Sequence, residues 1–217
     1  MPEIGRENWR QLARATAAHS TVTFNNTSSA RFVELATFRR MLGGSPIVGG
    51  PTRVTVDRED GSKMIVLRAM HDGYAKRFGI LHERILMLAA DGMRLGGEDI
   101  FLDVDDEPRV RGVHDEFAVR FHLHPTVRVT RLTDRHGVML MMPNKEVWSF
   151  IADHDRVDLE DSVYLAGSEG PRRTLQLVIR GHARTAARVQ WLLQAYPASA
   201  ANAGARHADE EEPRLPL

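Results

Sequence analysis

Short runs of apolar residues, alternating or continuous, are separated by glycine, aspartate, asparagine and proline through most of this chain. Such runs are typical of β-strands, and the residues between them are typical of tight turns. Asp91-Gly92, for example, follows one run and is a favoured two-residue hairpin turn. Roughly ten strand-like runs recur at intervals of about ten residues, with few helical patterns between them. The pattern therefore predicts an all-β fold, a two-layer antiparallel β-sandwich.

The longest strand signal begins at Phe117 and continues to Leu132. Successive side chains of a strand point to opposite faces, so residues two apart share a face. One face would carry Phe117, Val119, Phe121 and Leu123. The other face would carry Ala118, Arg120, His122 and His124. The apolar set is expected to face the core, which leaves the arginine and the two histidines on the other side.

Three segments are expected along the chain. Residues 1–18 would form an N-terminal linker or a short helix, and residues 19–196 would form the β-sandwich. Residues 197–217 are rich in Ala, Glu and Pro and are expected to be disordered. Residues 184–196 fit either a helix or a last strand, because they mix Ala and Leu with Val189 and Trp191.

Charge and composition exclude several classes of function. The chain has 29 basic and 29 acidic residues, a balance that argues against a nucleic-acid binder. It has no cysteine, so any metal would be bound by His, Asp or Glu. The first ten residues lack a signal-peptide profile, and the longest apolar run, Val138–Met142, is too short to span a bilayer. The chain as it stands is expected in the cytoplasm, or in the periplasm if it is a fragment of a longer, exported protein.

Four of the ten histidines occupy informative positions. His122 and His124 would project from one face of a strand, which suits a metal or an anionic sugar; a polar, solvent-facing strand is the alternative. His71 lies where a strand runs into a turn, a common place for binding sites, and a turn histidine that bonds loop carbonyls also fits. His19 opens the first strand.

A set of short motifs occurs in a fixed order along the chain. They are Ala15–Val22 (ATAAHSTV), Ala69–Gly79 (AMHDGYAKRFG), His82–Arg84 (HER), Leu95–Asp99 (LGGED), Phe117–Pro125 (FAVRFHLHP) and Asp161–Tyr164 (DSVY). Together they resemble the C-terminal domain of heparinase II/III-like polysaccharide lyases. The resemblance extends from about residue 8 to about residue 193, nearly the whole expected sandwich.

This resemblance implies both a fold and a chemistry. Members of the family carry an N-terminal α/α toroid before a sandwich of the lyase C-terminal supersandwich type, and they cleave uronic-acid polysaccharides by β-elimination. The uronate carboxylate must be neutralised, a base must remove the C5 proton, and an acid must protonate the departing O4. In the family, the toroid supplies a tyrosine and one histidine for these steps. This chain has no segment that resembles the toroid.

The resemblance also implies candidate catalytic and metal-binding residues. His19 matches the family's cleft-facing or metal-binding histidine and is the candidate catalytic residue, although Ser20 stands where the family has asparagine. His71 lies near the expected position of a second metal-binding histidine, and Glu34 is the nearest acidic residue. A zinc site would therefore use His19, His71 and Glu34.

Substrate binding is expected at Arg120, His122 and His124. Arg120 would pair with a uronate carboxylate through its planar guanidinium, and a surface salt bridge is its alternative role. Trp148 and Trp191 would either stack on sugar rings or pack in the core, and the apolar runs around them favour the core.

Three functions stay open at this point. The first is the sandwich domain of a polysaccharide lyase, which contributes to β-elimination and is inactive without its toroid. The second is a non-catalytic module that binds acidic carbohydrate, and the third is a structural sandwich without a ligand. The expected partners are an acidic polysaccharide and a separate or missing toroid, with no nucleic acid and no membrane span.

Overall fold

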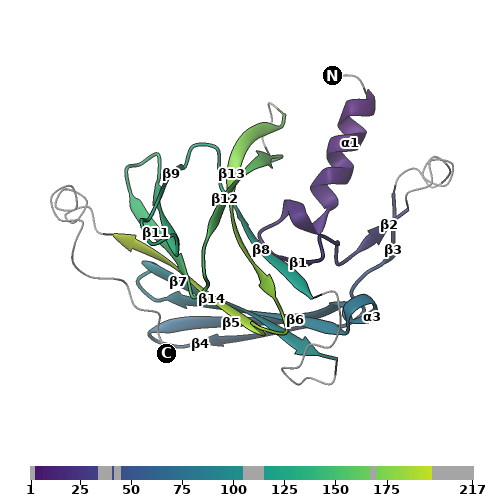
Figure 1. Ribbon diagram of the computed structural model, residues 1–217, viewed down its shortest axis with the longest axis horizontal. Coiled ribbons are helices and arrows are strands. Elements are labelled where there is room, and N and C mark those ends of the chain that lie inside the picture. Colours follow the sequence, from purple (N-terminus) through teal and green to yellow (C-terminus); the bar gives the residue numbers. More distant parts are fainter. Residues whose placement is uncertain (1–2, 34–40, 42–44, 105–114, 167–169, 197–217) are drawn as a thin grey trace.

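The computed structural model describes residues 3–33, 41, 45–104, 115–166 and 170–196. Most of these residues belong to strands that form two facing antiparallel sheets (Figure 1), so the predicted all-β sandwich is confirmed. The disorder predicted for residues 197–217 concerns a segment outside the described residues.

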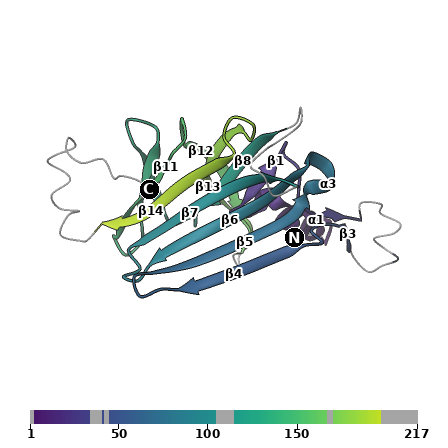
Figure 2. The same ribbon diagram turned by 90° about the horizontal axis from the view of Figure 1, so that it is seen from below.

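The larger sheet has eight strands. Their bounds are β4 (Val54–Asp60), β5 (Met64–Tyr74), β6 (Ile80–Ala89), β7 (Arg94–Asp103), β9 (Arg128–Arg131), β10 (Gly137–Met141), β11 (Val147–Ala152) and β14 (Arg188–Tyr196). Their order across the sheet is β4-β5-β6-β7-β14-β11-β10-β9, and all neighbours are antiparallel (Figure 2). Residues 184–196, whose sequence fitted either a helix or a strand, are therefore mostly the strand β14, which pairs with β7 and β11.

The smaller sheet has four strands in the order β1-β8-β13-β12. Their bounds are β1 (Val22–Phe24), β8 (Glu116–His122), β12 (Asp158–Tyr164) and β13 (Arg172–His182). A separate pair is formed by β2 (Arg31–Phe32) and β3 (Ile47–Gly49). The described helical segments are α1 (Glu3–Arg14), the 3-10 turn η1 (Thr16–Ala18) and α3 (Ala75–Phe78). Figure 1 shows α1 on the side of the smaller sheet that faces away from the larger one.

The hairpin between β6 and β7 turns at the predicted Asp91-Gly92, but its loop covers residues 90–93 and is therefore four residues long instead of two. Gly92 has a φ of 70°, which is the left-handed conformation that glycine adopts without steric cost. The Asp91 carboxylate accepts a hydrogen bond from the Met93 backbone N–H at 2.9 Å. This turn sets the register in which Leu88 of β6 pairs with Leu95 of β7.

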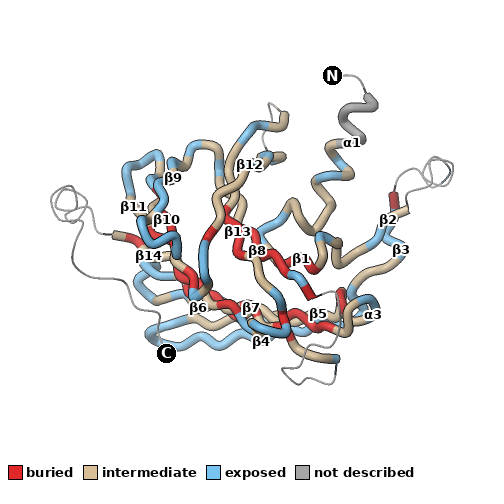
Figure 3. The backbone as a smooth tube through the Cα atoms, viewed as in Figure 1, coloured by how far each residue is buried: buried red, intermediate tan, exposed pale blue. Residues whose placement is uncertain are grey.

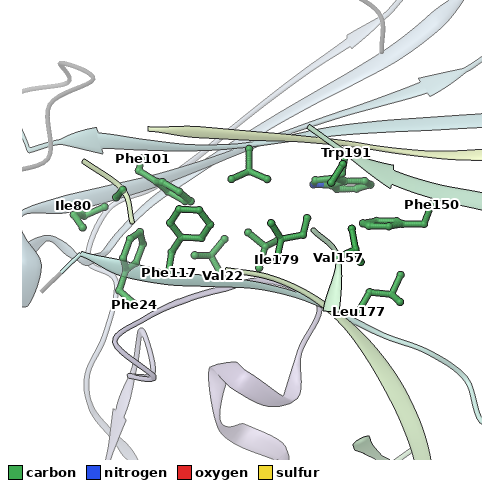
Figure 4. Close-up of a cluster of buried hydrophobic side chains, with 14 of the residues drawn as sticks. Val22, Phe24, Ile80, Phe101, Phe117, Phe150, Val157, Leu177, Ile179 and Trp191 are labelled. Atoms are coloured by element: carbon green, nitrogen blue, oxygen red, sulfur yellow. The ribbon is translucent and has the colours of Figure 1, made fainter. Parts of the chain in front are cut away.

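The hydrophobic core lies between the two sheets (Figures 3 and 4). The larger sheet contributes Ile80, Phe101, Phe150 and Trp191, and the smaller sheet contributes Val22, Phe24, Phe117, Leu177 and Ile179. Burial of such large apolar side chains is the main favourable contribution to folding. The edge strand β4 lies outside this core and is exposed along its length.

Trp191 is a core residue, as the apolar run around it favours. It is 4% exposed, and its ring lies edge-on to Phe121 with 4.8 Å between ring centroids. The indole lies directly against Gly97 of β7, where a side chain would have no room. The glycine therefore lets the indole approach the β7 backbone closely.

Candidate functional site

The face of the smaller sheet that points away from the core carries most of its polar side chains, and we call it the outer face. Across the strands, Ala118 pairs with Arg180, Arg120 with Val178, and His122 with Gln176. Directly opposite residues of antiparallel strands project to the same side. Arg120 and His122 therefore share the outer face, as the alternation along this strand predicts.

A cavity of about 530 Å³ lies at one end of the outer face, beside α1. Its polar lining consists of His19, His122, His124, Tyr164 and Thr174. We call it the histidine cavity. The structure therefore brings together three of the histidines that the sequence singles out: His19 after η1, His122 at the end of β8, and His124 just beyond it. The strand predicted from Phe117 to Leu132 is in fact two strands, β8 and β9, in different sheets, so His124 lies outside β8.

His122 is held by hydrogen bonds at both ring nitrogens. Its Nε2 lies 3.0 Å from the Ala17 carbonyl oxygen, and its Nδ1 lies 2.8 Å from Ser162 Oγ. A carbonyl only accepts, so Nε2 carries the proton and Nδ1 of the neutral ring accepts from Ser162. Burial lowers the pKa of His122, and the charge of Arg120 lowers it further, against the effect of the Ala17 bond. The neutral ring therefore fixes the segment before His19.

The other two histidines present their rings more openly. His19 is exposed, and its imidazole has no hydrogen-bond partner among the described residues. His124 is also exposed; its Nδ1 accepts from the Thr126 hydroxyl at 2.7 Å, and its ring lies edge-on to Tyr164. Nε2 of His124 and both nitrogens of His19 are therefore available to a ligand, within the part of the chain that the structure describes.

A chain of hydrogen bonds joins two more histidines to a buried carboxylate. The Gly73 N–H donates to Nδ1 of His71, so the neutral His71 ring carries its proton on Nε2. Nε2 of His71 lies 3.2 Å from Nδ1 of His82, and Nε2 of His82 lies 2.8 Å from the Asp99 carboxylate. Burial lowers the pKa of His71 to about 4, with a contribution from His82 and against the charge of Asp72.

Asp99 is fully buried and has three donor partners. Besides His82, Arg84 donates to both of its oxygens, at 2.7 and 3.0 Å, and the Trp191 indole donates at 3.1 Å. Burial favours the neutral acid, but these hydrogen bonds and the positive charges lower the pKa of Asp99 to about 2. Asp99 is therefore a carboxylate that is almost fully satisfied by hydrogen bonds.

Arg84 connects this network to the histidine cavity. Its Nη1 donates to the Ser20 backbone carbonyl at 2.6 Å, while Ser20 Oγ accepts from the His122 backbone N–H at 3.0 Å. The turn that carries His19 is thus fixed both to the interior of the larger sheet and to β8. The network holds the turn but does not itself line the histidine cavity.

Of the three predicted metal ligands, the structure describes His19 and His71, and it does not place them at the same cavity. His71 does not line the histidine cavity, and both of its ring nitrogens are engaged, one by Gly73 and one by His82. Glu34 lies outside the described residues. Within the residues that are described, no group of three His, Asp or Glu side chains is arranged to bind a metal. The zinc site remains a prediction, and no step proposed below uses a metal.

Arg120 shares the outer face with His122 but lines a different cavity. Its Nη1 donates to Thr23 Oγ1 on the neighbouring strand β1 and to the Ala118 carbonyl of its own strand, β8. Sequence spacing gives the face of a side chain but not the direction in which a long side chain lies along it.

Sequence reasoning assigned no role to Tyr164, Ser162, Arg84 or Asp99, although all four lie in the motifs that carry the family resemblance. A signal for the network does exist in the sequence. His82 and Arg84 are two apart on one strand, so they share a face, and a buried strand rarely carries two such residues without an acidic partner. The identity of that partner depends on the β6–β7 register, in which Arg84 pairs directly with Asp99.

Sequence comparison gives a family and one relative. The family model described as heparinase II/III-like, C-terminal, matches residues 1–192. FtsZ-localized protein C from Caulobacter vibrioides is 31% identical over 186 residues, which are 83% of this chain and 31% of that protein. The chain therefore spans about a third of the length of this relative.

Solved structures show the same fold at low sequence identity. Heparan sulfate lyase HepC from Pedobacter heparinus superposes with a TM-score of 0.66 and 12% identity, over 90% of this chain and 27% of that one. A heparinase III gene product superposes with a TM-score of 0.61 and 11% identity, over 92% of this chain and 27% of that one. None of the helices in the described residues has the length and apolar character of a membrane span.

Proposed function

The chain belongs to the family of heparinase II/III-like C-terminal domains, and we propose that it is the sandwich part of a longer protein that binds uronic-acid polysaccharides. In this proposal, an N-terminal α/α toroid and the sandwich together cleave the polymer by β-elimination. The sandwich alone binds the polymer but does not cleave it, because the toroid supplies the rest of the catalytic groups.

The observation that carries this proposal is the histidine cavity. A protonated imidazole can neutralise a carboxylate and a neutral one can accept a proton, and His19 lines the cavity with both of its ring nitrogens available. His124 offers a second ring nitrogen to the same space, and Tyr164 contributes an aromatic surface beside it. His122 acts as a positioning residue, because its ring nitrogens are bonded to Ala17 and Ser162. We assign the catalytic role to His19 and substrate binding to His124.

An exposed apolar strip on the edge strand β4 supports the presence of a further domain. Val54 and Val56 are 64% and 65% exposed and are two apart, so they lie on one face of the strand. They pair with His71 and Ala69 of β5, so this is the face of the sheet that carries His71. We assign the strip to contact with the toroid.

The test is an assay for the unsaturated uronate that β-elimination forms, which absorbs ultraviolet light. The chain alone should give no product, and the chain combined with a toroid from the longer protein should give product. His19→Ala should lower the rate of the combined protein by about a hundredfold or more. His136→Ala, an exposed histidine outside the cavity, should leave the rate unchanged. Product formation by the His19 variant at the normal rate would contradict the catalytic assignment.

A second candidate function is non-catalytic binding of an acidic glycan at the place in the cell where FtsZ is found. The observation that favours it is the relative named for its localisation with FtsZ, which is 31% identical to this chain, whereas the two lyase structures above are 11–12% identical. A fluorescent fusion of the full-length protein should then co-localise with FtsZ, and no unsaturated product should form with any toroid. Diffuse fluorescence together with product formation would favour the lyase instead.

A further inference from the structure

A second cavity, of about 340 Å³, lies on the outer face near the end of β1. Its lining includes Asn25, Asn26, Glu116, Ala118, Arg120 and Arg180. We call it the arginine cavity. It belongs to the same sheet face as His122 but shares no lining residue with the histidine cavity.

Arg120 is a buried cation without an anionic partner in the described structure. It is 8% exposed, and its hydrogen bonds, to Thr23 and Ala118, both leave from Nη1. No carboxylate of the described residues forms an ion pair with it, whereas Arg84 is paired with Asp99 and Arg180 with Glu160. A buried charge that is not compensated is costly, so folded proteins usually pair it.

Asn25 adds an unsatisfied donor to the same cavity. Its side-chain amide nitrogen is buried and has no hydrogen-bond partner among the described residues. Its φ of 46° places it in the left-handed region, and Asn26 beside it has a φ of 53°. Both residues lie in the turn after β1, which is closed by the isolated bridge between Phe24 and Thr27. The lining of the cavity therefore includes a guanidinium without an anionic partner, that of Arg120, and a side-chain amide without an acceptor, that of Asn25.

We propose that the arginine cavity binds an oxyanion of the acidic glycan, a carboxylate or a sulfate, between the Arg120 guanidinium and the Asn25 amide. This proposal rests on the proposed glycan binding and extends it to a second subsite. Arg120 and His122 are two residues apart on β8, which corresponds to about 7 Å along the strand. Because the Arg120 guanidinium turns toward β1, one oligosaccharide has to extend from the histidine cavity along the outer face to bring the charged group of another of its sugars to Arg120.

The surrounding charges set the strength of this subsite. Burial lowers the pKa of Arg120, and the like charge of Arg180 lowers it further, while Glu160 opposes both effects. Glu160 and Asp158 are already paired with Arg180. Glu116 is exposed at the cavity and would repel an incoming anion. Removal of that charge should therefore tighten binding.

Three variants and one control test the subsite. Asn25→Asp places a carboxylate in the lining of the cavity that Arg120 shares, without a change of shape, and aspartate tolerates a positive φ. It should raise or preserve the melting temperature and weaken the binding of an acidic hexasaccharide by about tenfold or more. Arg120→Gln should weaken binding to a similar extent. Glu116→Gln should tighten it by about threefold. Arg173→Gln, at an exposed arginine outside the cavity, should leave it unchanged.

The probes for calorimetry are an alginate-type hexamannuronate, a heparin hexasaccharide and neutral cellohexaose. If Asn25→Asp weakens the binding of hexamannuronate, the bound group is a carboxylate. If it weakens only the binding of the heparin hexasaccharide, the bound group is a sulfate. Cellohexaose should bind weakly to every variant and should not distinguish Asn25→Asp from the native chain.

Small anions separate the subsite from the proposed function. Glucuronate or inorganic sulfate should raise the melting temperature of the native chain but not that of Asn25→Asp. If this holds while no acidic hexasaccharide binds, the subsite stands and the proposed glycan binding fails. If the native chain binds acidic hexasaccharides and Asn25→Asp binds them equally well, the subsite is overturned while the glycan binding stands. If small anions and hexasaccharides both fail to distinguish the two proteins, the subsite is likewise overturned.

Discussion

Arg84 donates a hydrogen bond of 2.6 Å to the backbone carbonyl of Ser20, the residue that follows His19. The same guanidinium holds both oxygens of Asp99, a carboxylate with no exposed surface. The candidate catalytic turn is therefore attached to a charged group inside the larger sheet. The position of His19 depends on that interior pair as well as on its own segment.

Removal of the Asp99 charge should destabilise the fold. Asp99→Asn keeps the shape but leaves Arg84, whose side chain is 17% exposed, without its anionic partner, and breaking such a pair is expected to cost up to about 3 kcal/mol. Urea unfolding should show this loss of unfolding free energy. Glu59→Gln, on the exposed strand β4, is the control and should change it by less than about 0.5 kcal/mol. Equal stability of the two variants would show that the Asp99–Arg84 pair contributes little.

The stability of the chain should fall in mild acid because of His71. Its pKa is about 4 in the folded state and 6.5 as the ordinary value, so the unfolded state binds the proton first as the pH falls. The stability that the folded state gains from keeping His71 neutral is fully present above pH 6.5. It is lost between pH 6.5 and 4, and the total loss of unfolding free energy is about 3 kcal/mol at most.

Urea unfolding at several pH values, in the presence of a metal chelator, measures this effect. His71→Gln should reduce the slope of the unfolding free energy against pH between pH 6.5 and 4. A native slope near zero in that window would contradict the lowered pKa of His71.

Gly97→Ala should be strongly destabilising, because the added methyl group would overlap the Trp191 indole. Overpacking of this kind typically costs about 1–3 kcal/mol. Gly96→Ala is a matched control on the opposite face of β7, where the nearest atom is the terminal methyl group of the flexible Met87 side chain. Thermal unfolding should place the Gly97 variant well below the Gly96 variant. Similar melting temperatures would show that the indole can move aside.

The exposed strip on β4 should matter for domain assembly but not for folding. Val56→Lys changes a side chain that is 65% exposed, so the free energy of unfolding should change by less than about 0.5 kcal/mol. Binding of a separately expressed toroid, measured by size-exclusion chromatography, should be lost. Thr55→Lys, on the other face of the same strand, should still bind. Retained binding by the Val56 variant would place the toroid elsewhere.

The alternation along β8 was the part of the fold that could be predicted most reliably from the sequence, because one apolar face must meet the core. It placed Phe117 and Val119 inside and Arg120 and His122 outside. The segment that ends at Tyr196 stayed ambiguous for a physical reason. Its strand conformation depends on β7 and β11, whose pairing with it is not encoded in the local pattern.

The candidate site was predictable in part. The resemblance brought out His19, His122 and His124, and the structure gathers them at one cavity. The separation of Arg120 from them depends on the side-chain contact with Thr23 on a neighbouring strand. The His71–His82–Asp99 chain likewise depends on the registers of three strands, which no single-strand pattern specifies.

The central claim is that the histidine cavity binds an acidic glycan, and the most direct test is to follow the imidazole signals by nuclear magnetic resonance. Titration with hexamannuronate should shift the signals of His19, His122 and His124 and leave those of His136 and His154, which do not line the cavity, in place. Cellohexaose should shift none of them. Unchanged signals from His19, His122 and His124 at saturating hexamannuronate, or equal shifts with cellohexaose, would contradict the claim.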